Sequence, residues 1–310
     1  MREHTSMKKL LFAVIILAAC FSAASAEDAK QDSVKNSYWL KGITTDIGFS
    51  QLALSNWAAG GFGQISLNTY ADAYANYTKD NLLWNNEFQI GYGFIWSQED
   101  ASRIKKSDDR LILDSKFGYK AVEKLYISTI FNMRSQLAKG LDYNTDTQVS
   151  GFFAPAYISL GVGIDYSPWK NVSINFAPIT GNTVIVSIPE LRERYGNRID
   201  QACRFELGAQ MKLDAKLEVQ NFKASTSVLL FTDYLSKPFS VKVNWDANVE
   251  AKITKFFSVT LRTNLIYDDK VLFDKLDPVT GDVIGRGPKV QFKELFSAGF
   301  SYTFGQAKKK

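Results

Sequence analysis

Histidine and cysteine, the side chains on which much catalysis near neutral pH depends, are scarce in this 310-residue chain, and the one histidine lies near the start. The single histidine is His4, and the two cysteines are Cys20 and Cys203. Hydrolytic triads need an imidazole base beside the nucleophile, and many metal sites use imidazole ligands. Once an N-terminal leader is removed, no imidazole remains to activate a nucleophile or the Cys203 thiol. The sequence therefore predicts a protein that is not an enzyme and that holds no cofactor.

A second group of reactive residues consists of charged side chains at alternate positions of largely apolar stretches. Two carboxylates could act as acid and base on a glycoside. Here they are interleaved with arginines and lysines, so neutralising ion pairs are the better interpretation, because unpaired charge is costly to bury. Such residues would either pair across a narrow interior or line an aqueous pore. The candidate lumen charges are Glu87, Asp114, Arg134, Arg204, Glu206, Asp246 and Arg262.

Two acidic segments and one glycine-rich segment are candidate ligand sites. Neither Asp108-Asp109 nor the stretch from Asp268 to Asp277 has the ordered ligand spacing of a calcium loop, so both are expected to be solvated loops. Gly285-Arg286-Gly287-Pro288 lacks the strand-to-helix context of a phosphate loop and is interpreted as a turn.

The elements that must position these residues follow from a period of two. Apolar and small or polar residues alternate along most of the chain after about residue 40, and no convincing helix is found. In the last such stretch, Phe296, Phe300 and Phe304 face one way, with small residues between them. The expected strands run about 41–54, 64–77, 82–97, 110–120, 124–137, 156–167, 171–178, 201–213, 217–233, 239–252, 255–268 and 295–304.

The links between these strands alternate between tight and long, except that the link between 217–233 and 239–252 is short where a long one would fall. One tight link is placed at Asp214 to Lys216, and the longest link runs from Ile179 to Asp200. This alternation favours an all-β fold, a transmembrane antiparallel up-and-down β-barrel of about 12 strands with short periplasmic turns and long extracellular loops. A soluble exported β-sandwich is the alternative. The aromatic residues expected as girdles at the strand ends are Tyr38, Trp39, Trp84, Trp96, Trp169 and Tyr267.

The N-terminus predicts export. Met7-Lys8-Lys9 precedes an apolar run that closes on Ala24-Ser25-Ala26, which indicates cleavage after Ala26. Leu17-Ala18-Ala19-Cys20 also resembles a lipobox, which would instead leave Cys20 as a lipidated N-terminus. The expected organisation is a signal peptide at 1–26, a periplasmic lead-in at 27–40, an outer-membrane barrel at 41–305 and a basic tail at 306–310.

Several motifs along the chain resemble a known family. They are Ser50-Gln51, Ser55-Asn56-Trp57-Ala58-Ala59-Gly60-Gly61, Trp84-Asn85-Asn86, Gly91-Tyr92-Gly93, Leu265-Ile266-Tyr267-Asp268-Asp269 and Gln291-Phe292-Lys293-Glu294. The chain resembles the Bacteroidetes-type outer-membrane family catalogued as domain of unknown function 3078. The resemblance implies a barrel and an outer-membrane location, and it implies no activity. Within the motif from Ser55 to Gly61, the residues Asn56, Trp57, Gly60 and Gly61 form a candidate loop motif. It is either a partner loop or an in-folded loop whose Trp57 closes the barrel mouth.

Two functions from different classes remain. The first is a passive channel or transporter for a small hydrophilic or amphipathic solute. The second is a plugged structural or assembly barrel whose extracellular loops bind a partner. The expected partners are outer-membrane lipid and the barrel-assembly machinery, and the modest positive charge of the exported chain gives no reason to expect nucleic acid.

Overall fold

The computed structural model describes residues 38–52, 64–97, 100, 104–143, 145–277, 280 and 283–305. The expected signal peptide, most of the lead-in, the candidate loop motif at 56–61 and the tail at 306–310 lie outside these residues.

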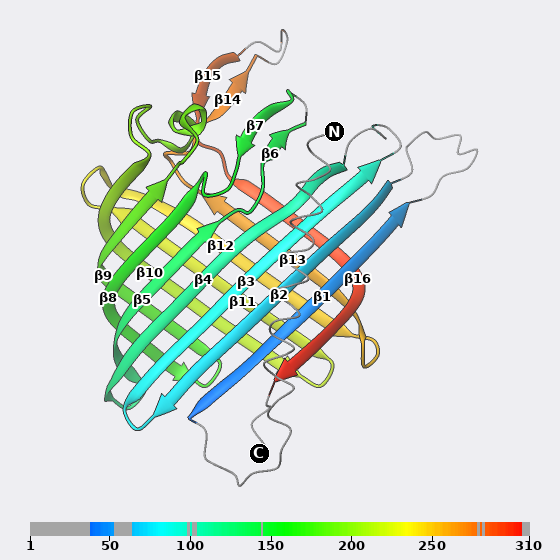
Figure 1. The fold of residues 1–310 in the computed structure, drawn as a ribbon. Coiled ribbons are helices and arrows are strands. Elements are labelled where there is room, and N and C mark those ends of the chain that lie inside the picture. Colours follow the sequence, from blue (N-terminus) through cyan, green and yellow to red (C-terminus); the bar gives the residue numbers. More distant parts are fainter. Residues whose placement is uncertain are drawn as a thin grey trace. The chain divides into compact units, whose positions relative to one another are not determined.

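Twelve strands of the described part form one closed antiparallel barrel (Figure 1). They are β1 (Trp39–Leu52), β2 (Gln64–Lys79), β3 (Leu82–Ser97), β4 (Ile104–Val122), β5 (Leu125–Ser135), β8 (Ala156–Trp169), β9 (Val172–Ile185), β10 (Cys203–Val219), β11 (Phe222–Asp233), β12 (Lys237–Lys252), β13 (Phe257–Tyr267) and β16 (Gln291–Gly305). Each strand lies beside the next barrel strand along the chain, and β1 pairs with β16 to close the ring. The predicted up-and-down barrel is confirmed.

The remaining described elements lie in the connections at one end. A hairpin of β6 (Gly140–Asp142) and β7 (Thr147–Ser150) follows β5, and a hairpin of β14 (Phe273–Leu276) and β15 (Val283–Gly287) follows β13. Two single-turn 3₁₀ helices, η2 (Pro189–Leu191) and η3 (Glu193–Tyr195), lie between β9 and β10. We call this end of the barrel the loop end and the other the turn end.

The turn end is built from tight connections. Asp80, Lys124 and Gln220 each take up a left-handed backbone conformation there, with φ of 51°, 65° and 46°. Such φ values occur at the central positions of two-residue hairpin turns, whose twist matches that of the flanking strands. Among the described residues, no helix is long and apolar enough to cross a membrane.

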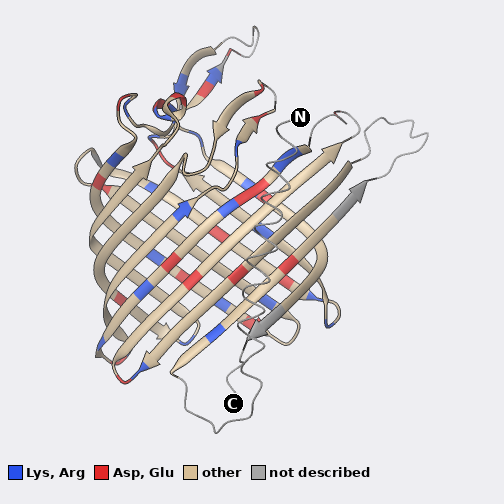
Figure 2. Cartoon of the chain, in the orientation of Figure 1, with Lys and Arg blue, Asp and Glu red and all other residues tan. Residues whose placement is uncertain are grey.

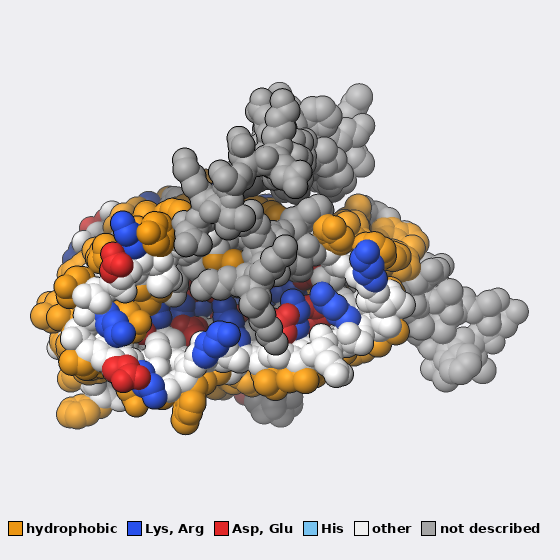
Figure 3. Space-filling model, turned by 90° about the horizontal axis from the view of Figure 1, so that it is seen from below, with side chains coloured by type: hydrophobic (Ala, Val, Ile, Leu, Met, Phe, Trp, Pro, Cys, Tyr) orange, Lys and Arg blue, Asp and Glu red, His pale blue; other side chains and the backbone are white. Residues whose placement is uncertain are grey.

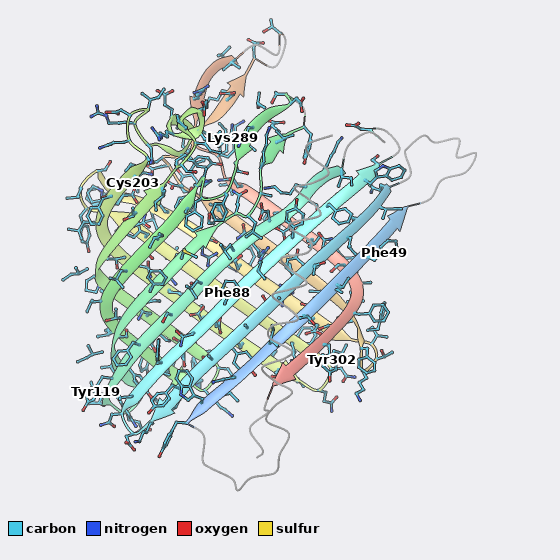
Figure 4. All side chains as sticks on the ribbon, in the orientation of Figure 1. Phe49, Phe88, Tyr119, Cys203, Lys289 and Tyr302 are labelled. Atoms are coloured by element: carbon cyan, nitrogen blue, oxygen red, sulfur yellow. The ribbon has the colours of Figure 1, made fainter. Side chains whose placement is uncertain are left out.

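The two faces of the barrel wall have opposite character. Large apolar side chains stand exposed on the outside, including Phe49, Tyr119 and Tyr302 (Figure 4), and viewed from the turn end apolar residues surround an interior that holds charged groups (Figure 3). Most buried side chains are polar or charged. This inverts the arrangement of a soluble protein, as lipid outside and a polar lumen inside require.

The aromatic residues expected as girdles are found near the strand ends. At the turn end, the rings of Trp39 and Tyr77 lie 5.1 Å apart and those of Trp39 and Trp84 lie 5.8 Å apart. Trp169, the last residue of β8, is largely exposed. Rings with a polar atom are favoured at the boundary between hydrocarbon and water, so this cluster marks the level of one interface.

The tight link predicted at Asp214 to Lys216 is wrong. β10 runs on to Val219, and the turn lies at Gln220 and Asn221. Leu213, Ala215, Leu217 and Val219 continue the outward apolar positions, while Asp214 and Lys216 occupy inward ones. Charged residues that face a polar lumen can therefore be mistaken for a turn when only the sequence is considered.

Other expected boundaries also shift. β1 begins at Trp39, inside the predicted lead-in, and β9 continues to Ile185, so the loop after it starts later than expected. β4 begins at Ile104, so Asp108 and Asp109 lie in a strand rather than in a solvated loop. The predicted turn at Gly285–Gly287 is part of strand β15.

Candidate functional site: a charged lumen with a chamber at the loop end

Ion pairs join strands that are not neighbours in the barrel wall. Lys212 Nζ on β10 donates to Asp114 Oδ2 on β4 at 2.7 Å, and Arg134 Nη1 on β5 donates to Asp246 Oδ2 on β12 at 2.7 Å. Figure 2 shows charged residues spaced along the barrel strands. Because these strands are separated by several others in the ring, the pairs span the lumen.

Burial differs strongly between the cross-lumen pairs. The Lys212 and Asp114 side chains are 8% and 18% exposed, and Asn132 Nδ2 donates a further bond of 2.7 Å to Asp114. Lys216 also pairs across the lumen with Glu87, but there the side chains are 61% and 38% exposed. The first pair is therefore held away from water, whereas water reaches the second.

Arg262 on β13 organises the wall where the barrel closes. Its Nη2 donates to Asp46 Oδ2 at 2.6 Å and lies 3.7 Å from Asp72 Oδ2. The guanidinium carbon lies 4.1 Å from the centre of the Tyr70 ring, a cation–π arrangement. Tyr70 Oη in turn donates to Asp108 Oδ2 at 2.5 Å, so the closure region is linked to β4.

Glu206 on β10 is the most highly coordinated acid of the loop half. Lys242 donates to both carboxylate oxygens, at 2.7 and 2.8 Å, Asn182 donates at 2.7 Å, and Arg204 donates as well. Lys270 reaches it at 2.9 Å from the connection that follows β13. One deeply buried carboxylate thus ties three barrel strands to a loop.

The connections at the loop end are docked on one another. Lys270 Nζ also donates to Asp233 Oδ2 at 2.6 Å, and Leu272 N donates to Arg194 O at 2.9 Å. Tyr195 Oη donates to Val149 O at 2.7 Å, and burial raises the pKa of the Tyr195 phenol, which keeps it a neutral donor. These contacts fix the loops over the barrel mouth.

Between the docked loops and the cross-lumen pairs lies a chamber of about 390 Å³. Its walls differ in chemistry. Charged side chains of β4 and β5 line one part, namely Lys106, Asp108, Asp109, Arg110 and Arg134, and apolar side chains of β11 and β13 line another, namely Leu229, Phe231 and Ile266. The lining residues are mostly polar or charged, with a smaller apolar part, and the cavity is large enough for a small molecule.

The structure places each candidate lumen charge in an ion pair. The pairs are Glu87–Lys216, Asp114–Lys212, Arg134–Asp246, Arg204–Glu206 and Arg262–Asp46. Of these residues, Arg134 and Asp246 line the chamber. The candidate loop motif of Asn56, Trp57, Gly60 and Gly61 lies outside the described residues.

Sequence reasoning missed several residues of this interior, among them Tyr70, Arg110, Lys270 and Lys293. Arg110 lies at the edge of the strand expected at 110–120, and its alternation with Asp108 and Ile112 would have shown that the strand begins earlier. Lys293 pairs with Asp108 from a part of β16 that was expected to be loop. Lys270 lies in a connection, where a period of two gives no signal.

A family match covers the first part of this barrel. Residues 49–141 match the family described as "Protein of unknown function (DUF3078)". The resemblance noted in the sequence is confirmed over that segment, which runs from the end of β1 into β6 and includes Arg110 and Arg134. No curated protein matches the chain.

Solved structures of low identity share the general architecture. An outer membrane channel from Pseudomonas putida F1 is 11% identical, with a TM-score of 0.38 over 89% of this chain and 100% of the channel. The translocator domain of the autotransporter NalP from Neisseria meningitidis is 11% identical, with a TM-score of 0.33 over 96% and 98%. The toluene transporter TodX from P. putida is 10% identical, with a TM-score of 0.28 over 88% and 91%. At these scores none of them lends this chain a function.

Proposed function

We propose that the protein is an outer-membrane transport barrel that passes a small solute through its charged lumen. The observation that carries the proposal is the chamber of about 390 Å³ inside a barrel whose outside is apolar and whose inside is polar. A barrel that served only as a wall would gain stability by filling such a space with side chains. The expected orientation puts the loop end outside the cell and the turn end in the periplasm.

The cross-lumen ion pairs form the constriction on this path. A solute in the chamber meets Arg134–Asp246 and then Lys212–Asp114 as it moves toward the turn end. Paired charges of opposite sign give little net field at this constriction, so we expect the constriction itself to add little selectivity between cations and anions. Since the pairs occupy part of the cross-section, we expect a small conductance.

Conductance of the refolded protein, residues 27–310, in a planar bilayer tests the proposal. We expect discrete steps that grow in the double variant Arg134→Gln/Asp246→Asn, which removes both members of a cross-lumen pair and leaves no charge unpaired. The matched control is Arg198→Gln/Asp200→Asn, an exposed pair in the connection before β10, for which no change is expected. A correctly folded barrel that stays silent in both variants would overturn transport.

A second candidate function is favoured by the same cross-lumen contacts. Pairs that link opposite walls, together with loops held over the mouth by Lys270, support a closed barrel that presents its loops to a partner. In that case the loop motif at Asn56, Trp57, Gly60 and Gly61 is the candidate contact surface. Silence in the bilayer, combined with loss of partner capture on Trp57→Ala, would favour this function.

A further inference from the structure

The apolar wall of the chamber is unusual for a lumen of this kind. On β11 the inward positions nearer the turn end hold Ser225 and Ser227, whereas Leu229 and Phe231 occupy the same face nearer the loop end. On β13, Ile266 follows the inward residues Arg262 and Asn264. Leu229 and Ile266 are half-buried and Phe231 is nearly buried, so a ligand on this wall would cover mainly the apolar surface of Leu229 and Ile266 and gain affinity by removing it from water.

Two arginines, Arg110 and Arg134, lie on the charged wall of the chamber and have N–H groups without a hydrogen-bond partner in the described part of the chain. Ile112 on β4 is the register partner of Arg134 on β5, so Arg110 lies diagonally next to Arg134 on the same inward face. Diagonal neighbours of this kind have β-carbons roughly 7 Å apart, within reach of one bound group. Two guanidinium groups therefore face one chamber from adjacent strands.

Neither arginine is fully paired by the described residues. Arg134 gives one N–H to Asp246, and its buried Nε has no hydrogen-bond partner. Arg110 has the looser contact, because its Nη2 lies 3.5 Å from Asp108 Oδ2 and its buried Nε is also without a partner. By comparison, Lys106 in the same wall donates to Asp109, to Gln136 and to the carbonyl of Ala138.

Asp108 has other partners besides Arg110. It accepts hydrogen bonds from Lys293 Nζ and from Tyr70 Oη, and both donors come from other strands. Arg110 is therefore the looser of the two cations beside this carboxylate, and its remaining N–H groups are open to a ligand. A guanidinium in this state is a ready partner for a carboxylate, which it can bind through two parallel N–H···O bonds.

We infer that the chamber binds a small organic anion, a carboxylate that carries an apolar body. The carboxylate lies on Arg110, with Arg134 beside it, and the apolar body lies against Leu229, Phe231 and Ile266. A volume of about 390 Å³ suits a ligand of this class. The inference rests on the proposed function only in that the chamber is taken as the resting place of the transported solute.

Three compounds separate the two halves of this recognition. Isothermal titration of the detergent-solubilised barrel, residues 27–310, is made with phenylacetate, with uncharged 2-phenylethanol and with acetate, which lacks the ring. We expect phenylacetate to bind at least about tenfold more tightly than either of the others, because each of them forfeits one of the two sets of contacts. Equal binding of all three compounds, or no binding of phenylacetate to the folded barrel, would overturn the inference.

Variants then locate the site. Arg110→Gln keeps Asp108 paired with Lys293, so the barrel should fold, and phenylacetate should bind at least about tenfold more weakly. Leu229→Asn should weaken the binding of phenylacetate and leave the binding of acetate unchanged. The matched control is Arg198→Gln, which removes an exposed arginine outside the chamber. If Arg110→Gln does not fold, Arg110→Lys keeps the positive charge. A lower affinity of the Lys variant for phenylacetate then reports the loss of the two parallel N–H···O bonds. Unchanged affinity in the folded Arg110 variants would exclude this site.

The binding and conductance measurements fail independently. A barrel that binds phenylacetate at Arg110 but never conducts retains the anion site and loses the transport function. A barrel that conducts but does not discriminate among the three compounds retains transport and loses the anion site.

Discussion

Lys212 and Lys216 lie four residues apart on the same face of β10, yet their charges are expected to contribute differently to stability. Lys212 is buried against Asp114, whereas Lys216 and Glu87 are open to water. Removing one member of a buried pair leaves the other without its counter-charge in a poorly solvated place. Removing one member of an exposed pair leaves a charge that water solvates.

We therefore predict that Lys212→Met lowers the free energy of unfolding by about 3 kcal/mol, since Asp114 loses its cation. Lys216→Met, four residues along the same strand, should lower it by less than about 1 kcal/mol. Urea unfolding of the refolded barrel followed by tryptophan fluorescence measures both. The double variant Lys212→Met/Asp114→Asn should recover most of the loss, and equal effects of the two single variants would contradict this account.

At this scale the sequence predicts which charges face inward but not which charges meet. Alternation alone places Arg134 and Asp246 on the inner face of their strands, because side chains alternate every residue. Their contact depends on the order of strands around the ring, which brings residues 112 positions apart to 2.7 Å. Arg110 and Lys293 were missed because Arg110 lies at the very start of an expected strand and Lys293 lies before one.

At the scale of elements, the strand interiors were predictable and their ends were not. Apolar and polar residues alternate within β3, β8, β12 and β13 because one face meets lipid and the other a polar lumen. The strand predicted at 201–213 ends too early, because the charged residues Asp214 and Lys216 resemble a turn when the lumen that they face is not known. The hairpins β6–β7 and β14–β15 were missed because short strands beyond the membrane have no lipid-facing side.

The packing of neighbouring strands gives a prediction at this scale. A β-carbon added at Gly208 on β10 would overlap the carbonyl oxygen of Thr232 on β11, so Gly208→Ala forces the two strands apart. We expect it to lower the free energy of unfolding by about 2 kcal/mol or to block folding. Gly285→Ala in β15 is the control, with no atom within 4 Å of the new carbon, and should change stability by less than about 0.5 kcal/mol. The folded band on a semi-native gel, followed against temperature, compares the two, and a normal transition in Gly208→Ala would refute the clash.

For the whole molecule, the fold predicts which end of the barrel faces outside the cell and which faces the periplasm. The long connections, with β14–β15 among them, should lie outside the cell, and the tight link between β4 and β5 should face the periplasm. Single cysteines report this directly once Cys203, the one free cysteine of the described residues, is replaced by serine.

We predict that Gly285→Cys in this background is labelled by a membrane-impermeant maleimide on intact cells. Glu123→Cys, in the tight link, should be labelled only after the outer membrane is permeabilised. Quantified labelling of the purified protein from both treatments is the measurement. The reverse pattern would place the loop end in the periplasm and invert the direction of the proposed path.

The pairing of β1 with β16 also governs how the protein can be made. Thr45 Oγ1 donates to Tyr302 O across this seam at 3.5 Å, and the two residues are 257 positions apart in the chain. Until the last strand has been synthesised, β1 has no partner on one side, and an unpaired strand edge is a template for aggregation. Biogenesis must therefore shelter an incomplete sheet until translation ends, and a nonsense mutation near the 3′ end of the coding sequence would abolish the barrel rather than shorten it.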